Sequence, residues 1–381
     1  MTLKWSPDFN PPAQGHIIYT IDTTTGGTTP SNVDFNLRTL DAVNYKVVWE
    51  DSIEETSTSN TLLHTYGSPG TYSVQVFPTG TYRPYFNNVS ADVDQLIKVS
   101  IGGAVKFPNN FTYAWLGADR MTEFECNFNV TSNVTSMYGA WQNCSSLASL
   151  PLIDTSACTD FARSWQGCSS LTSFPLIDTS SGTAFTATWF GCNSLTSFPA
   201  IDTSAAITLG STWYTCNSLT SFPLIDTSSA TNLAATWYGC NSLTSFPAID
   251  TSNATTLLQA WRACSSLTSF PLLSIANVTS FNQTWFQCSS LIDFPANFFD
   301  SWTATPANGC FLSTWLSCTS LSATSVENIL NSIDTSGRSA PASNVDITIS
   351  FNAASGTPNI STAVASLKSR GWTITLNGVL Q

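Results

Sequence analysis

Cysteine recurs every 24 residues through the middle of this 381-residue chain. Stacked repeats lie about 5 Å apart, which is within the Cα range of a disulfide, so neighbouring cysteines could bridge. Zinc is disfavoured because no Cys-x-x-Cys pair and no nearby histidine occur. We expect a column of buried thiols, since each cysteine stands in the same place beside tryptophan and leucine and can pack as a small apolar side chain. The four central members are Cys168, Cys192, Cys216 and Cys240.

An aspartate column has the same spacing. Carboxylates at repeat distance repel one another, which would raise their pKa values or attract cations. Calcium is a minor alternative, because one carboxylate per layer supplies too few ligands unless other oxygens join. The favoured interpretation is a series of turn caps, in which Asp accepts from backbone N–H groups further on, and no metal is expected. The residues are Asp178, Asp202, Asp226 and Asp250.

A third column follows a tryptophan in each repeat and is mostly aromatic. Exposed rings in a row could stack against the faces of sugars, so this column is the candidate ligand-binding site. Packing against a neighbouring loop or a partner chain is the favoured alternative. The column consists of Phe190, Tyr214, Tyr238, Arg262 and Phe286, with Arg262 interrupting the rings.

Catalytic chemistry has few candidates in this composition. His16 and His64 are the only imidazoles, and neither lies in the repeats. Hydrolysis by a Ser-His-Asp or Cys-His arrangement therefore has no base there. Because the repeats distribute the same residue types everywhere, we predict no catalytic residue, no cofactor and no enzymatic activity.

The element that must position these columns is a repeat of 24 residues, present about nine times. A Trp stands three residues before each Cys and a Leu three residues after it, and a Phe-Pro step follows. Phe185, Trp189, Cys192 and Leu195 have the spacing of one face of a short helix, and Phe198 begins an extended segment. Such a period is typical of stacked supersecondary units that share one core. The core tryptophans at the centre of the series are Trp165, Trp189, Trp213 and Trp237.

The residue pattern of these repeats, as in residues 136–156 and 233–252, resembles that of the BspA-like leucine-rich-repeat proteins of bacterial surfaces and phage virions. The resemblance covers about residues 93–321. It implies an α/β leucine-rich-repeat-like solenoid with short strands, and a role in adhesion, host-surface recognition or virion structure. This chain departs from the commonest pattern, which has Met-Phe before the Cys.

The flanking segments predict separate parts. Alternating runs with His64-Thr65-Tyr66 and Gly70-Thr71-Tyr72 resemble a PKD-type immunoglobulin-like β-sandwich, although the turn at 49–52 lacks its glycines. Beyond the repeats, residues 325–333 and 361–370 predict helices, and 346–351 and 372–376 predict strands, which together would form an α/β cap. The predicted division is an arm at 1–30, a β-sandwich at 31–92, repeats at 93–321 and a cap at 322–381.

Charge and targeting signals limit the classes of function that the sequence favours. The net charge is −12 and only 9% of residues are charged, so the chain offers nucleic acid no cluster of cations. The first residues do not resemble a signal peptide, and no apolar run is long enough to predict membrane insertion.

We expect a phage virion protein on the particle exterior, such as a tail fibre, receptor-binding protein or capsid appendage. Its partners would be other virion proteins through the N-terminal domain, a host glycan, and further copies in a homo-oligomer. The alternatives are a bacterial cell-surface adhesin and a capsid decoration protein without a ligand.

Overall fold

The computed structural model describes residues 15–24, 34–40, 44–86, 93–103, 105–127 and 131–381. The chain divides into two compact units, residues 1–158 and 159–381. This division falls within the repeats and differs from the four parts expected from the sequence. Residues 1–14 and 25–30 of the expected arm lie outside the described residues.

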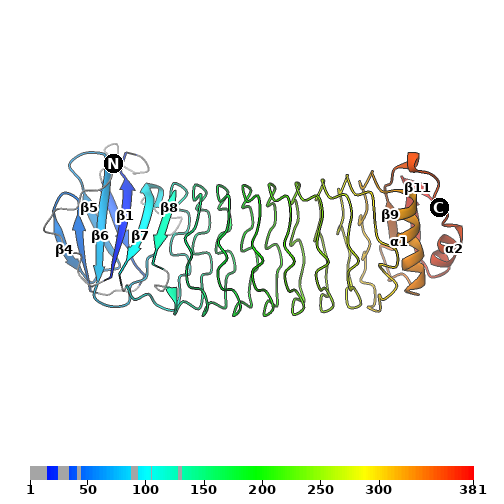
Figure 1. The fold of residues 1–381 in the computed structure, drawn as a ribbon, viewed down its shortest axis with the longest axis horizontal. Coiled ribbons are helices and arrows are strands. Elements are labelled where there is room, and N and C mark those ends of the chain that lie inside the picture. Colours follow the sequence, from blue (N-terminus) through cyan, green and yellow to red (C-terminus); the bar gives the residue numbers. More distant parts are fainter. Residues whose placement is uncertain (1–14, 25–33, 41–43, 87–92, 104, 128–130) are drawn as a thin grey trace. The chain divides into compact units, whose positions relative to one another are not determined.

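A six-stranded sheet dominates the first unit, with the order β4-β3-β6-β1-β7-β8. In β1 and β3, buried and half-buried side chains alternate, so one face of each of these two strands packs on the core. β1 lies within the expected arm and is an inner strand, antiparallel to β6 and β7, while β8 pairs with β7 in parallel. A separate two-stranded sheet joins β2 and β5 (Figure 1). The bounds are β1 His16–Asp22, β2 Asp34–Arg38, β3 Tyr45–Trp49, β4 Glu54–Ser57, β5 Thr61–Thr65, β6 Thr71–Pro78, η1 Val93–Gln95, β7 Leu96–Gly102 and β8 Glu123–Cys126.

His64 lies in an aromatic stack inside this unit. Its ring is parallel to that of Trp49 with the centroids 4.2 Å apart, and it meets Tyr66 edge-on at 4.6 Å. The His64 Nε2 atom is 2.8 Å from an Asp51 carboxylate oxygen, and the Trp49 indole donates to Glu55 at 3.0 Å. Because the histidine is buried and held on several sides, it acts as part of the core.

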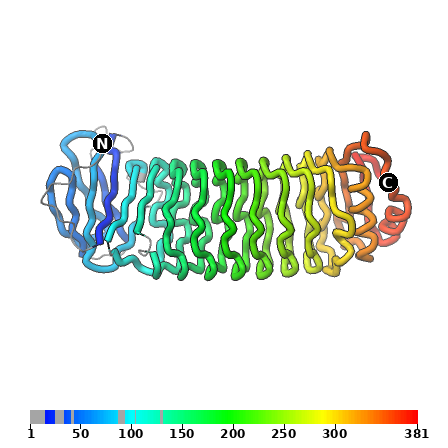
Figure 2. The backbone as a smooth tube through the Cα atoms, viewed as in Figure 1, coloured from blue at the N-terminus to red at the C-terminus, as the bar shows by residue number. Residues whose placement is uncertain are grey.

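The repeats in residues 159–321 consist of consecutive turns, and one repeat forms one layer of the stack (Figure 2). Isolated parallel bridges join the layers, from Asp160 to Ala184 and from Ala184 to Thr208, and the series continues to Ser280. Backbone N–H groups also donate from layer to layer, as from Trp189 to the Thr212 carbonyl at 2.9 Å. These bonds lie at and just before the tryptophan, whereas the segments at the Phe-Pro steps, where short strands were expected, form no strand in residues 159–321.

The expected fold class, a β-sandwich followed by an α/β leucine-rich-repeat-like solenoid and an α/β cap, is wrong. Residues 131–322 contain neither an α-helix nor a strand. The hydrogen bonds are of the turn type, such as Cys192 N–H to the Trp189 carbonyl at 3.2 Å. Positive φ angles at Ala187 (57°) and Gly191 (75°) interrupt the helical conformation on both sides of the tryptophan. The apolar spacing of three and four residues arises from successive tight turns rather than from a helix.

The α-helices of the described residues both lie near the C-terminus. They are α1 (Ala323–Thr335), which Ser322 caps, and α2 (Ser361–Ser369). A three-stranded sheet accompanies them, with β9 (Asp346–Ile349) parallel to β10 (Thr373–Leu376), β11 (Val379–Leu380) antiparallel to β10, and a short η3 (Ala353–Ser355) before α2. These positions agree within a few residues with the helices and strands expected there.

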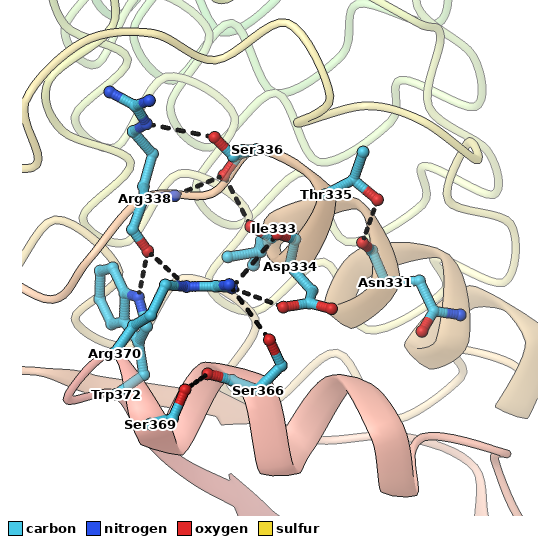
Figure 3. Close-up of polar contacts among 10 residues, drawn as sticks. All are labelled: Asn331, Ile333, Asp334, Thr335, Ser336, Arg338, Ser366, Ser369, Arg370 and Trp372. Atoms are coloured by element: carbon cyan, nitrogen blue, oxygen red, sulfur yellow. Dashed lines mark hydrogen bonds and ion pairs between the residues drawn. The ribbon is translucent and has the colours of Figure 1, made fainter.

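Arg370 ties the ends of the two helices together (Figure 3). Its guanidinium donates to the Asp334 carboxylate at 2.5 Å, to the Asp334 carbonyl at 3.2 Å and to the Arg338 carbonyl at 3.2 Å. The Trp372 indole donates to the same Arg338 carbonyl at 2.9 Å. Arg370 therefore bonds one carbonyl of the last turn of α1, which also accepts from the Gly337 N–H, and one carbonyl of the segment that follows the helix.

Candidate binding surface

The column that follows the tryptophans forms a continuous stack in the structure, which we call the ring ladder. Phe190 and Tyr214 have ring centroids 4.4 Å apart and planes 2° apart. Tyr214 and Tyr238 follow at 4.3 Å and 10°. The remaining members are Arg262 and Phe286, and all five side chains are half-buried. The structure thus brings together, in one column, every residue that the sequence predicts for ligand binding.

Arg262 continues the stack. Its guanidinium carbon lies 5.2 Å from the ring centroid of Tyr238 and 4.8 Å from that of Phe286, so it occupies the layer between two rings. A planar cation between two ring faces has favourable electrostatic contacts with both. Gln283 holds the arginine in this layer by accepting from its Nη1, and it also accepts from Gln259 at 2.7 Å.

The backbone sets the pitch of the ring ladder. Residues 191, 215 and 239 each follow a ladder residue and donate their N–H to the carbonyl of the ladder residue one repeat later, at 2.6–2.8 Å. All three have φ between 55° and 75°. This left-handed conformation turns the chain so that Trp189, Trp213 and Trp237 point inward while the next residue points outward.

Ring stacking limits what the ladder can bind. Face-to-face contact at 4.3–4.4 Å leaves no room for a sugar between the rings, so a ligand would meet ring edges and the hydroxyls of Tyr214 and Tyr238. Burial, together with the neighbouring Tyr238, raises the pKa of Tyr214, which stays a neutral hydrogen-bonding group at neutral pH. The ladder therefore presents a narrow polar edge with one guanidinium, rather than a set of open ring faces.

The aspartate column serves as a row of turn caps. Asp178 accepts from the backbone N–H of Ser180 at 3.0 Å and from its hydroxyl at 2.7 Å, and Asp202, Asp226 and Asp250 accept the equivalent backbone bonds at 2.8–2.9 Å. The bonds from Ser180 and Ser228 lower the pKa of Asp178 and Asp226. Among the described residues, no group of three or more His, Cys, Asp or Glu side chains could hold a metal ion. Calcium binding was the minor alternative for this column, and no such ligand group includes its members.

The core columns beside the ladder are built from tryptophan, phenylalanine and cysteine. From Trp165 to Trp285 successive indole rings are nearly parallel, with centroids 5.3–6.2 Å apart. A phenylalanine in the same layer meets each of them edge-on at 4.8–5.0 Å, as Phe198 meets Trp189 at 4.8 Å. All of the tryptophans at 165, 189, 213 and 237 are fully buried. This herringbone pattern places ring edges against ring faces, which suits the charge distribution of aromatic rings.

Each thiol of the cysteine column donates to the carbonyl of the tryptophan in the preceding layer. The distance is 3.2–3.3 Å for Cys192, Cys216 and Cys240, and every cysteine of the chain is free of disulfides. Cys168 is equally buried. Burial raises the pKa of Cys216 to about 12, so the thiolate that reagents and metals require is scarce at neutral pH.

Two features of the ladder escaped the sequence analysis. One is the continuity of the stack through Arg262, which the sequence suggested was an interruption. The other is the pair Gln259 and Gln283, both two residues before a tryptophan, where an amide in adjacent repeats could have indicated a hydrogen-bonded pair. Both features depend on the distance between layers, which the repeat length does not specify.

Comparison with family models, curated proteins and solved structures finds no match to this chain. Among the described residues, none of the helices has the length and apolar character needed to cross a membrane.

Proposed function

We propose that this chain is a structural and adhesive protein of a phage virion, exposed on the particle as part of a tail fibre, receptor-binding protein or capsid appendage. The observation that carries the proposal is the ring ladder, in which five consecutive layers present one column of half-buried side chains, three of which, Tyr214, Tyr238 and Arg262, carry a polar group. A row of like sites favours a repetitive ligand, because weak contacts per repeat add up along a polymer.

The chemistry of the ladder edge suits a host glycan. The hydroxyls of Tyr214 and Tyr238 can donate and accept, and the guanidinium of Arg262 can donate to hydroxyl or carboxylate oxygens. The 9% content of charged residues in the whole chain leaves hydrogen bonding as the main source of polar recognition. Other virion proteins would bind through the N-terminal unit, a role that rests on the resemblance alone.

One observation favours a second candidate, a structural protein without a ligand. The ring faces are already in contact with one another, so the ladder stabilises the stack whether or not anything binds. The alternative is a bacterial cell-surface adhesin, which would have the same binding function at a different location.

A glycan array tests the binding function directly. The wild-type chain is compared with the Tyr214→Ala/Tyr238→Ala variant, and with Thr220→Ala as a matched control at an exposed position outside the ladder. We expect the double variant to lose at least tenfold in apparent affinity and the control to keep its binding. Binding that survives in the double variant would remove the ladder from the function, and absence of wild-type binding would favour the structural candidate.

Location is tested separately. Antibodies against the chain are applied to purified phage particles and to the surface of intact host cells, and the label is located by electron microscopy. Labelling of particles supports the virion proposal, whereas labelling confined to cells without particles supports the cell-surface alternative.

A further inference from the structure

An apolar stripe runs along the second unit on the segment after each Phe-Pro step. Every member is exposed, and the leucines are the most prominent, with 63%, 64% and 55% of Leu176, Leu224 and Leu272 accessible to solvent. Residues 159–381 are all described, and nothing in them covers the stripe. We call it the Leu/Ala stripe; its members in order of layer are Leu176, Ala200, Leu224, Ala248, Leu272 and Ala296.

Local backbone geometry forces these side chains outward. In three layers the N–H two residues after the proline donates back to the proline carbonyl, from Ile177, Ile201 and Ile249 at 2.9–3.0 Å. The stripe residue is therefore the middle residue of a three-residue turn, and the isoleucine after it is buried. Folding cannot bury this position, so its apolar character needs another reason.

The stripe has a period of two layers rather than one. Leucine and alanine alternate, so each alanine leaves a notch between two leucine side chains. The same period appears beneath the surface in the phenylalanine column, where the centroid distances are 5.7 Å, 6.4 Å, 5.7 Å and 6.3 Å from Phe174 to Phe270. A partner that fills the notches must present apolar side chains at twice the layer spacing.

A second copy of the stripe has that spacing. We propose that the Leu/Ala stripe is the contact surface of a two-fold symmetric, antiparallel pair of these chains. Reversing the order of the six layers converts every leucine into an alanine and every alanine into a leucine. In the antiparallel pair, Leu176 meets Ala296, Ala200 meets Leu272 and Leu224 meets Ala248, so large and small side chains interdigitate at every layer. In a parallel pair in register, leucine would meet leucine and leave gaps between the alanines.

The size and charge of the surroundings predict a weak association. A stripe one or two residues wide and six layers long buries less than the roughly 800 Å² per partner of a standard interface. Exposed carboxylates at Asp178, Asp202, Asp226 and Asp250 follow the stripe by two residues, at most about 7 Å along the chain. Because these charges repel across the interface, the dissociation constant should fall as salt screens them.

A swap of two facing residues tests the pairing. Sedimentation velocity over a concentration series gives the dissociation constant of the full chain and of Leu224→Ala, Ala248→Leu and the double variant. We expect each single variant to weaken the dimer about tenfold or more, through a gap in one case and a clash in the other. The double variant should recover the wild-type constant, because leucine again faces alanine.

This design separates the proposal from simple surface stickiness. Ala248→Leu adds apolar surface, so non-specific association would increase, whereas the proposed pairing requires it to decrease. Thermal unfolding monitored by circular dichroism confirms that each variant is folded, which is expected because both positions are exposed. A wild-type chain that stays monomeric at near-millimolar concentration and high salt would overturn the proposal.

Disulfide trapping tests the antiparallel direction. Leu176→Cys and Ala296→Cys are prepared separately and oxidised alone and as a mixture. The antiparallel pair requires a covalent dimer only in the mixture, because residue 176 of one chain lies opposite residue 296 of the other. Covalent dimers of either variant alone would contradict it. The wild-type chain, oxidised in parallel, measures the background from the native thiols, of which Cys126 is half-buried and the others are buried.

Discussion

The Trp column and the ring ladder are adjacent in sequence and have the same 24-residue period, yet they differ in almost every physical property. The Trp column is fully buried and keeps one residue type from Trp165 to Trp285, with centroids 5.3–6.2 Å apart. The ring ladder is half-buried, contains Phe, Tyr and Arg, and packs its rings at 4.3–4.4 Å. Position on the inner or outer side of the layer therefore decides how much a residue can vary.

The difference follows from what each column contacts. A Trp ring meets two other Trp rings and the edges of two Phe rings, so its shape is constrained on all sides. A ladder residue stacks on its two neighbours in the column, and a flat side chain of another type can take its place there, as the guanidinium of Arg262 does with an added hydrogen bond to Gln283. Substitutions in the two columns should consequently lower the free energy of unfolding by very different amounts.

The largest effect is expected for Trp213→Ala. Removing this ring leaves a cavity between two layers and should lower the free energy of unfolding by about 3–5 kcal/mol. Chemical denaturation of the full chain measures the loss, and hydrogen exchange should locate it in the layers of Trp189 and Trp237. A loss no greater than that of a ladder variant would break the comparison.

Tyr214→Ala should lower the free energy of unfolding by less, about 1–2 kcal/mol, because two stacking contacts are lost and water can enter the site. Tyr214→Phe keeps both ring contacts and serves as the matched control, with stability close to that of the wild type. The same denaturation experiment compares both variants. Equal losses for Phe and Ala would show that the hydroxyl, and not the stack, holds the ladder together.

Thr215→Gly should raise stability by about 1 kcal/mol. Thr215 has a φ of 55°, a conformation that is costly for a β-branched residue, whereas glycine occupies the equivalent positions 191 and 239. Gly191→Ala is the reverse test and should lower the midpoint of thermal unfolding, since its added Cβ meets nothing closer than 3.8 Å and only backbone strain remains. A destabilised Thr215→Gly variant would mean that its methyl contact with the next layer outweighs the strain.

The smallest effect concerns the turn caps. Hydrogen bonds from Ser228 lower the pKa of Asp226 in the folded chain, so the carboxylate contributes stability above its unfolded pKa of about 4 and loses it as pH falls through the folded value. At this exposed site we expect the carboxylate to contribute on the order of a few tenths of a kcal/mol to the free energy of unfolding. Denaturation of the wild type and of Asp226→Asn from neutral pH to pH 3 should show the difference between them shrinking with acidity. A difference that does not change with pH would show that the charge of Asp226 does not contribute to the cap.

Sequence alone determined the period, the columns and which of them are buried. Regular spacing reveals these features because every layer repeats the same burial, and the inward positions of Trp189 and Cys192 follow from their uniform residue type. The C-terminal helices and strands were also predictable, because residues 322–376 carry ordinary local signals such as the cap at Ser322 and the glycine at 371.

Only the tertiary structure decided that the repeats are turns and that the ladder is one continuous stack. A spacing of three and four residues fits both a helix and a series of tight turns, and the sign of φ at Ala187 is set by bonds to the neighbouring layer rather than by the residue itself. The stack through Arg262 likewise requires a layer distance that matches the thickness of a flat side chain. That distance results from the packing of the whole unit, so no single repeat could have revealed it.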